Sequence, residues 1–136
     1  MIEVVRTLEL SETPSAVWAR IGAFKAIGCW HPAVASAAIS LADGRERRTL
    51  TLTDGATLVE DRIDDGGDRF AYEYQITEGP LPVANYTSSF SVEPHGMGSK
   101  ITWRGVFNAD GTENGDAEAI IAGVYEGGLN AIAEGA

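Results

Sequence analysis

Over most of the chain, hydrophobic and polar residues alternate with a period of two, which is the pattern of half-buried β-strands. Turn signals such as Asp43-Gly44 and Asp54-Gly55 separate the alternating segments. The pattern predicts seven strands, at residues 2–10, 34–41, 47–53, 56–63, 69–77, 83–92 and 99–108. Because short turns connect the last six strands, we expect them to pair in an antiparallel sheet.

Residues 113–134 are the only long segment with a clear helical period. The apolar face of this predicted helix consists of Ala117, Ile120, Ile121, Val124, Gly128, Ala131 and Ile132. Thr112 or Asn114 is expected to cap its start. Gly128 carries no side chain, so we expect it to keep a cavity open between the helix and the sheet, opposite Tyr72 and Tyr74.

Two short helices are predicted between the first and second strands. Thr13 and Pro14 suit the N-cap and the first helical position, and a second piece ends before Pro32. The fold class is therefore α+β: a seven-stranded antiparallel curved sheet, with two short helices after the first strand, wrapped around a long C-terminal helix. A sheet with one apolar face has to cover it, and the long helix is the available apolar stripe. We expect a single domain over residues 1–136.

Composition narrows the class of function. With 44% hydrophobic and 22% charged residues, the chain resembles ordinary globular proteins, and its apolar runs are too short to insert into a membrane. A net charge of −10 argues against a nucleic-acid partner, which requires a basic surface. The single cysteine, Cys29, excludes an internal disulfide, is expected to be buried and suits a reducing, cytoplasmic location.

Several motifs follow one another along the chain. They are Trp30-His31-Pro32, Arg48-Thr49-Leu50, Asp54-Gly55, Leu58-Val59-Glu60, Tyr72-Glu73-Tyr74, Gly79-Pro80-Leu81-Pro82-Val83 and Val124-Tyr125-Glu126-Gly127-Gly128-Leu129. Together with the order of the elements, they resemble the START/polyketide cyclase superfamily, also called SRPBCC. The resemblance is to its small bacterial polyketide cyclase/dehydrase-like members. Their helix-grip fold is shared with birch-pollen-allergen and plant hormone-receptor proteins.

The resemblance implies a deep, mostly apolar pocket between helix and sheet. Its expected lining is Trp30, His31, Val34, Tyr72, Tyr74, Tyr86, Phe90, Trp103, Phe107, Ile121, Val124, Tyr125 and Gly128. Such a pocket would bind or carry a hydrophobic small molecule: a lipid, a polyketide or an aromatic metabolite. Neither a cofactor nor a metal is expected, and a homodimer is compatible with the sequence.

The alternative is a cyclase or dehydratase. In that case His31 would act as the acid or base, because histidine titrates near neutral pH. Tyr72 and Tyr86 would donate hydrogen bonds to an oxyanion. The competing interpretation of His31 is a structural side chain that fixes its loop.

The remaining charged residues have plainer interpretations. The carboxylates Glu60, Asp61, Asp64, Asp65 and Asp68 are interpreted mainly as a solvated hairpin tip rather than a metal site. Arg48 shares a strand face with Leu50 and Leu52. Arg48 or Arg104 would bind a ligand carboxylate, lie on the surface as a strand residue, or pair with Glu60 and Glu73.

Overall fold

The computed structural model describes residues 1–67 and 69–135, so Asp68 of the acidic hairpin lies outside the described residues. Its strands are β1 (Ile2–Leu10), β2 (Val34–Ala42), β3 (Arg45–Leu52), β4 (Thr57–Asp64), β5 (Ala71–Glu78), β6 (Val83–His95) and β7 (Gly98–Ala109). Its helices are α1 (Pro14–Ile21), the short 3-10 helix η1 (Phe24–Ala26), α2 (Ile27–Trp30) and α3 (Asn114–Glu134).

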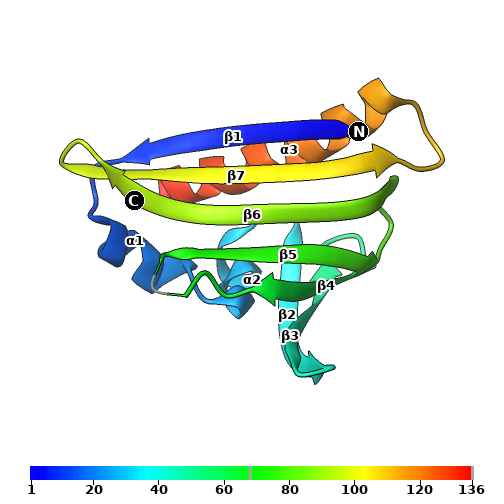
Figure 1. Ribbon diagram of the computed structural model, residues 1–136, viewed down its shortest axis with the longest axis horizontal. Coiled ribbons are helices and arrows are strands. Elements are labelled where there is room, and N and C mark those ends of the chain that lie inside the picture. The colour runs from blue at the N-terminus through cyan, green and yellow to red at the C-terminus, as the bar shows by residue number, and fades with distance from the viewer. Residues whose placement is uncertain (68, 136) are drawn as a thin grey trace.

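The strands form one antiparallel sheet in the order β1-β7-β6-β5-β4-β3-β2. Consecutive strands from β2 to β7 are neighbours, and β1 closes the other edge by pairing with β7. Figure 1 shows α3 behind β1 and β7, while β2 and β3 turn steeply away from the long strands. The sheet therefore curves around the side that carries the helices, and the predicted fold class is confirmed.

The start of α1 follows the sequence prediction. The hydroxyl of Thr13 accepts a hydrogen bond from the backbone N–H of Ala16, and Pro14 occupies the first turn. The start of α3 differs, because Glu113 takes the N-cap position and no side chain caps it. Its backbone carbonyl accepts instead from the N–H groups of Asp116 and Ala117. The prediction of Thr112 or Asn114 as the cap was wrong.

The inner face of α3 packs against the sheet. Its buried residues are Ala117, Ile121, Ala122, Tyr125, Gly128, Leu129 and Ile132. Ile120 is 42% exposed, contrary to the prediction, because the buried stripe passes through residues 121 and 125 and leaves residue 120 at its side. Among the described residues, no helix is long and apolar enough to cross a membrane.

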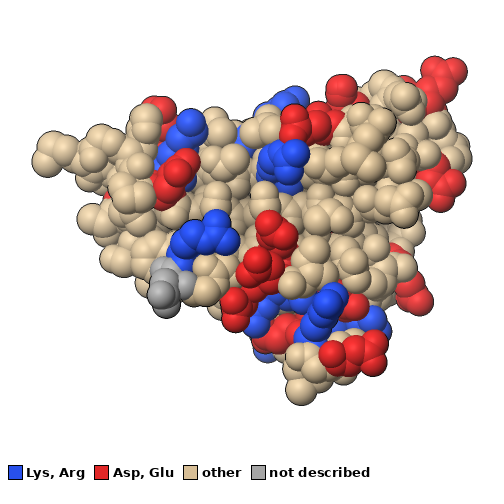
Figure 2. Space-filling view, viewed as in Figure 1, with Lys and Arg blue, Asp and Glu red and all other residues tan. Residues whose placement is uncertain are grey.

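The outer face of the sheet is polar. Figure 2 shows basic and acidic side chains interspersed on the face seen in Figure 1. Arg104 belongs to this surface: it is half-exposed and pairs with Glu3 on the neighbouring strand β1. Arg104 is therefore a surface strand residue, which is one of the alternatives that the sequence left open, and its partner is Glu3.

Candidate functional site

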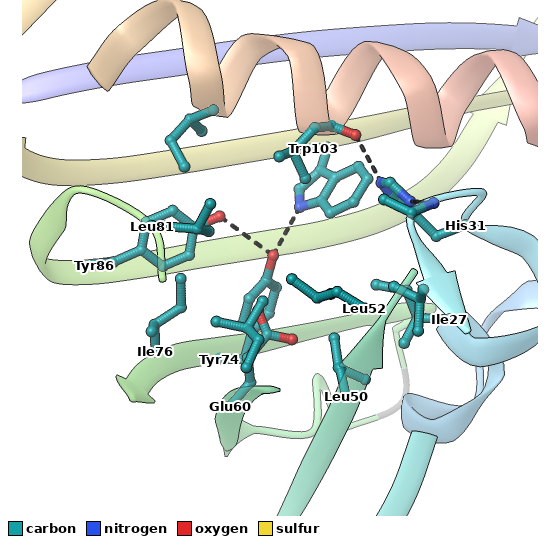
Figure 3. A pocket seen from close by; sticks show the side chains of 15 residues that line it. Ile27, His31, Leu50, Leu52, Glu60, Tyr74, Ile76, Leu81, Tyr86 and Trp103 are labelled. Atoms are coloured by element: carbon teal, nitrogen blue, oxygen red, sulfur yellow. Dashed lines mark hydrogen bonds between the residues drawn. The ribbon is translucent and has the colours of Figure 1, made fainter. Parts of the chain in front are cut away.

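A cavity of about 80 Å³ lies between α3 and the curved part of the sheet. Figure 3 shows its side chains converging from the strands, from α2 and its following loop, and from α3. The cavity is lined by Ile27, His31, Ala33, Val34, Leu50, Leu52, Leu58, Glu60, Tyr74, Ile76, Leu81, Tyr86, Trp103, Ile121 and Val124. Aliphatic side chains dominate this lining, and Glu60 is the only carboxylate among the described residues that form it.

The structure brings about half of the predicted lining residues to this cavity. They are His31, Val34, Tyr74, Tyr86, Trp103, Ile121 and Val124. The other predicted residues are not in its lining; they are Trp30, Tyr72, Phe90, Phe107, Tyr125 and Gly128. All of these except Trp30 are buried in the core. Half of the lining residues that were not predicted to line the pocket come from β3 and β4: Leu50, Leu52, Leu58 and Glu60.

Stacked aromatic rings fill the space that was predicted to be open beneath α3. Trp103 stacks on Tyr125 with ring centroids 4.4 Å apart, and Phe90 meets Trp103 edge-on at 5.3 Å. Gly128 belongs to this packing: a Cβ atom there would lie within 2.8–2.9 Å of the rings of His31, Trp103 and Trp30. Gly128 therefore allows close contact of rings with the helix, and the prediction that it keeps a cavity open was wrong.

Both ring nitrogens of His31 are engaged. Nδ1 lies 3.1 Å from the backbone N–H of Ala33 and accepts from it. Nε2 lies 2.8 Å from the carbonyl oxygen of Val124 on α3, so Nε2 carries the proton and donates it. Burial lowers the pKa of the His31 imidazole, which keeps the ring neutral. The contacts are those of the structural interpretation, in which His31 fixes the loop before β2, here to α3.

This pKa shift predicts an acid-sensitive stability. The folded pKa of His31 is below the unfolded value of about 6.5, so protons bind the unfolded chain more strongly. The stabilisation is complete above pH 6.5 and is lost as the pH falls below it. We expect the free energy of unfolding, measured in urea from pH 7 to pH 5, to decrease less in His31→Gln than in wild type. His95→Gln is the surface control, and equal pH slopes in all three proteins would contradict the prediction.

The tyrosine hydroxyls are linked in a hydrogen-bonded chain with one direction. The Ser88 hydroxyl donates to the backbone carbonyl of Arg104 at 2.7 Å, so at Tyr125, 3.1 Å away, it can only accept. The proton of Tyr125 is thereby used. In the hydrogen bond between the hydroxyls of Tyr86 and Tyr125, Tyr86 must then be the donor.

The same logic extends to the cavity. With its proton given to Tyr125, Tyr86 can only accept from the Tyr74 hydroxyl, 3.3 Å away. Tyr74 in turn accepts from the indole N–H of Trp103 at 3.0 Å. We call the series Trp103, Tyr74, Tyr86, Tyr125 and Ser88 the hydroxyl chain. Burial raises the pKa of Tyr74 and Tyr86 well above 10, so their protons stay in place.

The hydrogen bonds that Tyr72 and Tyr86 make decide whether their hydroxyls could donate to an oxyanion. Tyr86 lines the cavity, but its proton is already donated within the hydroxyl chain. Tyr72 is not in the cavity lining, and its hydroxyl accepts from Arg48 Nη1 at 3.4 Å. The structure does not bring these two hydroxyls and His31 together as a set of free acid–base groups.

A buried ion pair stands beside the cavity. Arg48 on β3 and Glu60 on β4 are paired directly across the two strands and are 0% and 4% exposed. Arg48 Nε donates to Glu60 Oε1 at 2.7 Å, and Nη1 donates to the carbonyl of Phe24 at 2.8 Å. Burial alone would lower the pKa of the Arg48 guanidinium, but the Glu60 carboxylate together with the Tyr72 and Tyr74 side chains outweighs this effect, so the net shift is upward. The shared strand face of Arg48, Leu50 and Leu52 was the sequence signal for this burial.

The other sequence candidates lie away from the cavity. Cys29 is exposed, so the prediction of a buried cysteine was wrong; the short helix α2 buries Ile27 instead. Asp61 pairs with Arg47 at 2.6 Å on the outer face. Asp64 and Asp65 accept hydrogen bonds from backbone N–H groups within their own turn. In the part of the chain that the structure describes, no cluster of potential metal ligands is found.

The curved sheet around a long C-terminal helix, with an apolar cavity between them, places this protein in the class of helix-grip proteins. The chain belongs to the family described as polyketide cyclase/dehydrase and lipid transport, whose model matches residues 1–136. Among curated proteins, none matches this sequence.

Solved structures extend the comparison. The protein XoxI from Bacillus cereus is 30% identical, with a TM-score of 0.86 over 97% of this chain and 93% of that chain. The ZhuI aromatase/cyclase from Streptomyces sp. R1128 is 15% identical, with a TM-score of 0.75 over 96% and 90% of the two chains. Ara h 8.0201 is 17% identical, with a TM-score of 0.74 over 96% of this chain and 94% of that chain. At these lower identities the last two show a shared fold alone.

Proposed function

We propose that this protein binds a small hydrophobic molecule, or the apolar end of a longer one, in the cavity between the sheet and α3. The observation that carries this proposal is an interior cavity whose wall is mostly aliphatic. Apolar walls with a few polar groups are typical of small-molecule sites. The family description, which includes lipid transport, supports the same class of ligand.

The size of the cavity limits what it holds. Its volume of about 80 Å³ is well below the roughly 300–1,000 Å³ of sites that enclose a drug-sized ligand. Several lining residues, among them Leu52, Leu81 and Val124, are only partly buried, so the cavity reaches the surface at its rim. A longer lipid or polyketide would place one end inside and extend past this rim.

Binding is favoured over catalysis because of the contacts of the polar groups. His31 has no free ring nitrogen, and the hydroxyl chain has no proton to offer to a developing oxyanion. The predicted cyclase mechanism needs His31 as a free acid or base and a tyrosine proton for the oxyanion, and both are already engaged. A cyclase mechanism through His31 would first have to break its bonds to Val124 and Ala33.

A cavity-filling substitution tests the proposal. Toluene is a suitable probe, since it is apolar and small. We expect Val124→Phe to weaken toluene binding at least tenfold, because the larger ring occupies the cavity from the α3 side. Binding is measured by titration, following the NMR signal of the Trp103 indole N–H, which belongs to a lining residue.

The matched control is Ala119→Phe, which adds the same ring to the exposed side of the same helix. This control should bind toluene like wild type. Equal toluene affinity in folded Val124→Phe, or no binding of toluene to any of the proteins, would contradict the proposed site.

A further inference from the structure

In the described part of the chain, the polar groups on the cavity wall have free acceptor capacity but no free side-chain donor. Side-chain donors there are already used: Trp103 donates to Tyr74, and His31 donates to the carbonyl of Val124. The hydroxyls of Tyr74 and Tyr86 give their protons along the hydroxyl chain. Each of these phenol oxygens still has a free lone pair, because it can accept two hydrogen bonds and here accepts only one. The wall therefore offers acceptors.

Glu60 adds the strongest of these acceptors. Figure 3 shows its carboxyl group beside Tyr74, at the lower side of the cavity. Oε1 accepts from Arg48 Nε at 2.7 Å, whereas a carboxylate can accept about four hydrogen bonds. Arg48 itself is not in the cavity lining, so it holds Glu60 from the far side. The carboxylate can accept further bonds from the cavity.

Two buried N–H groups among the described residues lack a hydrogen-bond partner, but neither belongs to the cavity lining. They are Trp30 Nε1 and Arg48 Nη2. The Arg48 guanidinium lies over the ring faces of Phe24 and Tyr74, with its carbon 4.1 and 4.8 Å from the ring centroids. Ring faces are weak acceptors for such a cation. These donors therefore leave the acceptor character of the wall unchanged.

We infer that the cavity selects hydrophobic molecules that carry a neutral hydroxyl group, an alcohol or a phenol, and that this hydroxyl donates to Glu60. The inference rests on the proposed function, since it names the ligand class of the same cavity. A ketone or ester of equal size would place its carbonyl oxygen, an acceptor, against the acceptors of the wall. It would lose its hydrogen bonds to water and gain none from the protein. An ammonium group is disfavoured because Arg48 already balances the charge of Glu60.

A series of small ligands tests this on the wild-type protein. Cyclohexanol and cyclohexanone have rings of the same size and differ in having a donor or only an acceptor. We expect cyclohexanol to bind about tenfold tighter or more, the effect of one hydrogen bond to a charged group. Toluene reports on the apolar contribution alone. Affinities are measured by calorimetry and by the NMR shift of the Trp103 indole N–H.

The outcomes separate the two proposals. If toluene binds but cyclohexanone binds as tightly as cyclohexanol, the cavity is a hydrophobic site and the inference about hydroxyl ligands is overturned. If none of the three binds, the proposed function itself fails for small ligands. Cyclohexanol binding that leaves the Trp103 signal unchanged would place the alcohol elsewhere and also count against the inference.

Glu60→Gln provides a second test with a defined sign. The glutamine oxygen can replace Oε1 at Arg48, which turns its NH₂ group toward the cavity and changes an acceptor into a donor. We expect the preference to reverse, so that cyclohexanone binds at least as tightly as cyclohexanol. The control Glu73→Gln is exposed on β5 and absent from the lining, and it should keep the wild-type preference. An unchanged preference in folded Glu60→Gln would overturn the role of Glu60, and the wild-type series decides if that variant does not fold.

Discussion

Replacing Glu60 with leucine is expected to lower the free energy of unfolding by about 3–5 kcal/mol, the usual loss when one partner of a buried ion pair is removed. Arg48 has 0% exposure, so its charge would remain in the core without a carboxylate. The guanidinium cannot release its proton as a lysine would. Urea denaturation at pH 7, with the signal of the tryptophans, measures the change.

Two controls separate charge burial from loss of packing. The double variant Arg48→Met/Glu60→Leu removes both charges, and we expect it to recover most of the stability lost in the single variant. Asp61→Leu removes the carboxylate of the neighbouring Arg47–Asp61 pair on the same two strands; the Asp61 side chain is 10% exposed, but Arg47 is 36% exposed and keeps its access to water. Its loss should be within about 1 kcal/mol. A similarly small loss in Glu60→Leu would show that Arg48 finds water, and would refute the buried pair.

At Gly128, even one added methyl group is expected to destabilise the protein. A Cβ there would meet ring atoms of His31, Trp103 and Trp30 at 2.8–2.9 Å, and these rings are held by their own contacts. Overpacking of this kind costs about 1–3 kcal/mol. Thermal unfolding of Gly128→Ala, followed by circular dichroism, should therefore show a lower midpoint than wild type.

Gly127→Ala and Gly123→Ala are the matched controls on the same helix. Nothing lies within 4 Å of a Cβ at either position, so only the helix propensity changes. Each should raise stability by about 1 kcal/mol. If Gly128→Ala is stabilised to the same degree, the rings move aside easily and the packing described beneath α3 is not tight.

The fold could be predicted because its signals are local. The alternation in β5 and β7, the Asp-Gly turns and the Thr13-Pro14 start each need only a few neighbouring residues. Ile120 shows the limit of such reasoning: one residue of helical phase decides between burial and exposure, and only the sheet contacting α3 sets that phase. Cys29 was misplaced for the same reason, since a short helix has too few residues to show which side is buried.

The candidate site was predictable in part because aromatic rings mark the interior without showing how they fill it. Tyr74, Tyr86 and Trp103 do line the cavity, whereas Tyr125 and Phe90 occupy the space that a ligand was expected to take. The direction of the hydroxyl chain depends on the bond from Ser88 to a backbone carbonyl on β7, a contact that no sequence pattern reveals. The acceptor role proposed for Glu60 depends on Arg48 contacting its carboxylate from outside the cavity, and the sequence pattern does not show this arrangement.

The division between the hydroxyl chain and the aliphatic wall has an evolutionary consequence. The chain joins β5, β6, β7 and α3, while much of the wall comes from side chains that form no part of it. These include Ile27, Val34, Leu50, Leu52, Leu58 and Leu81. Selection can exchange such residues for larger or smaller ones without disturbing the bonds that hold α3 to the sheet. Descendants of one ancestor could in this way acquire different ligands while keeping the same frame.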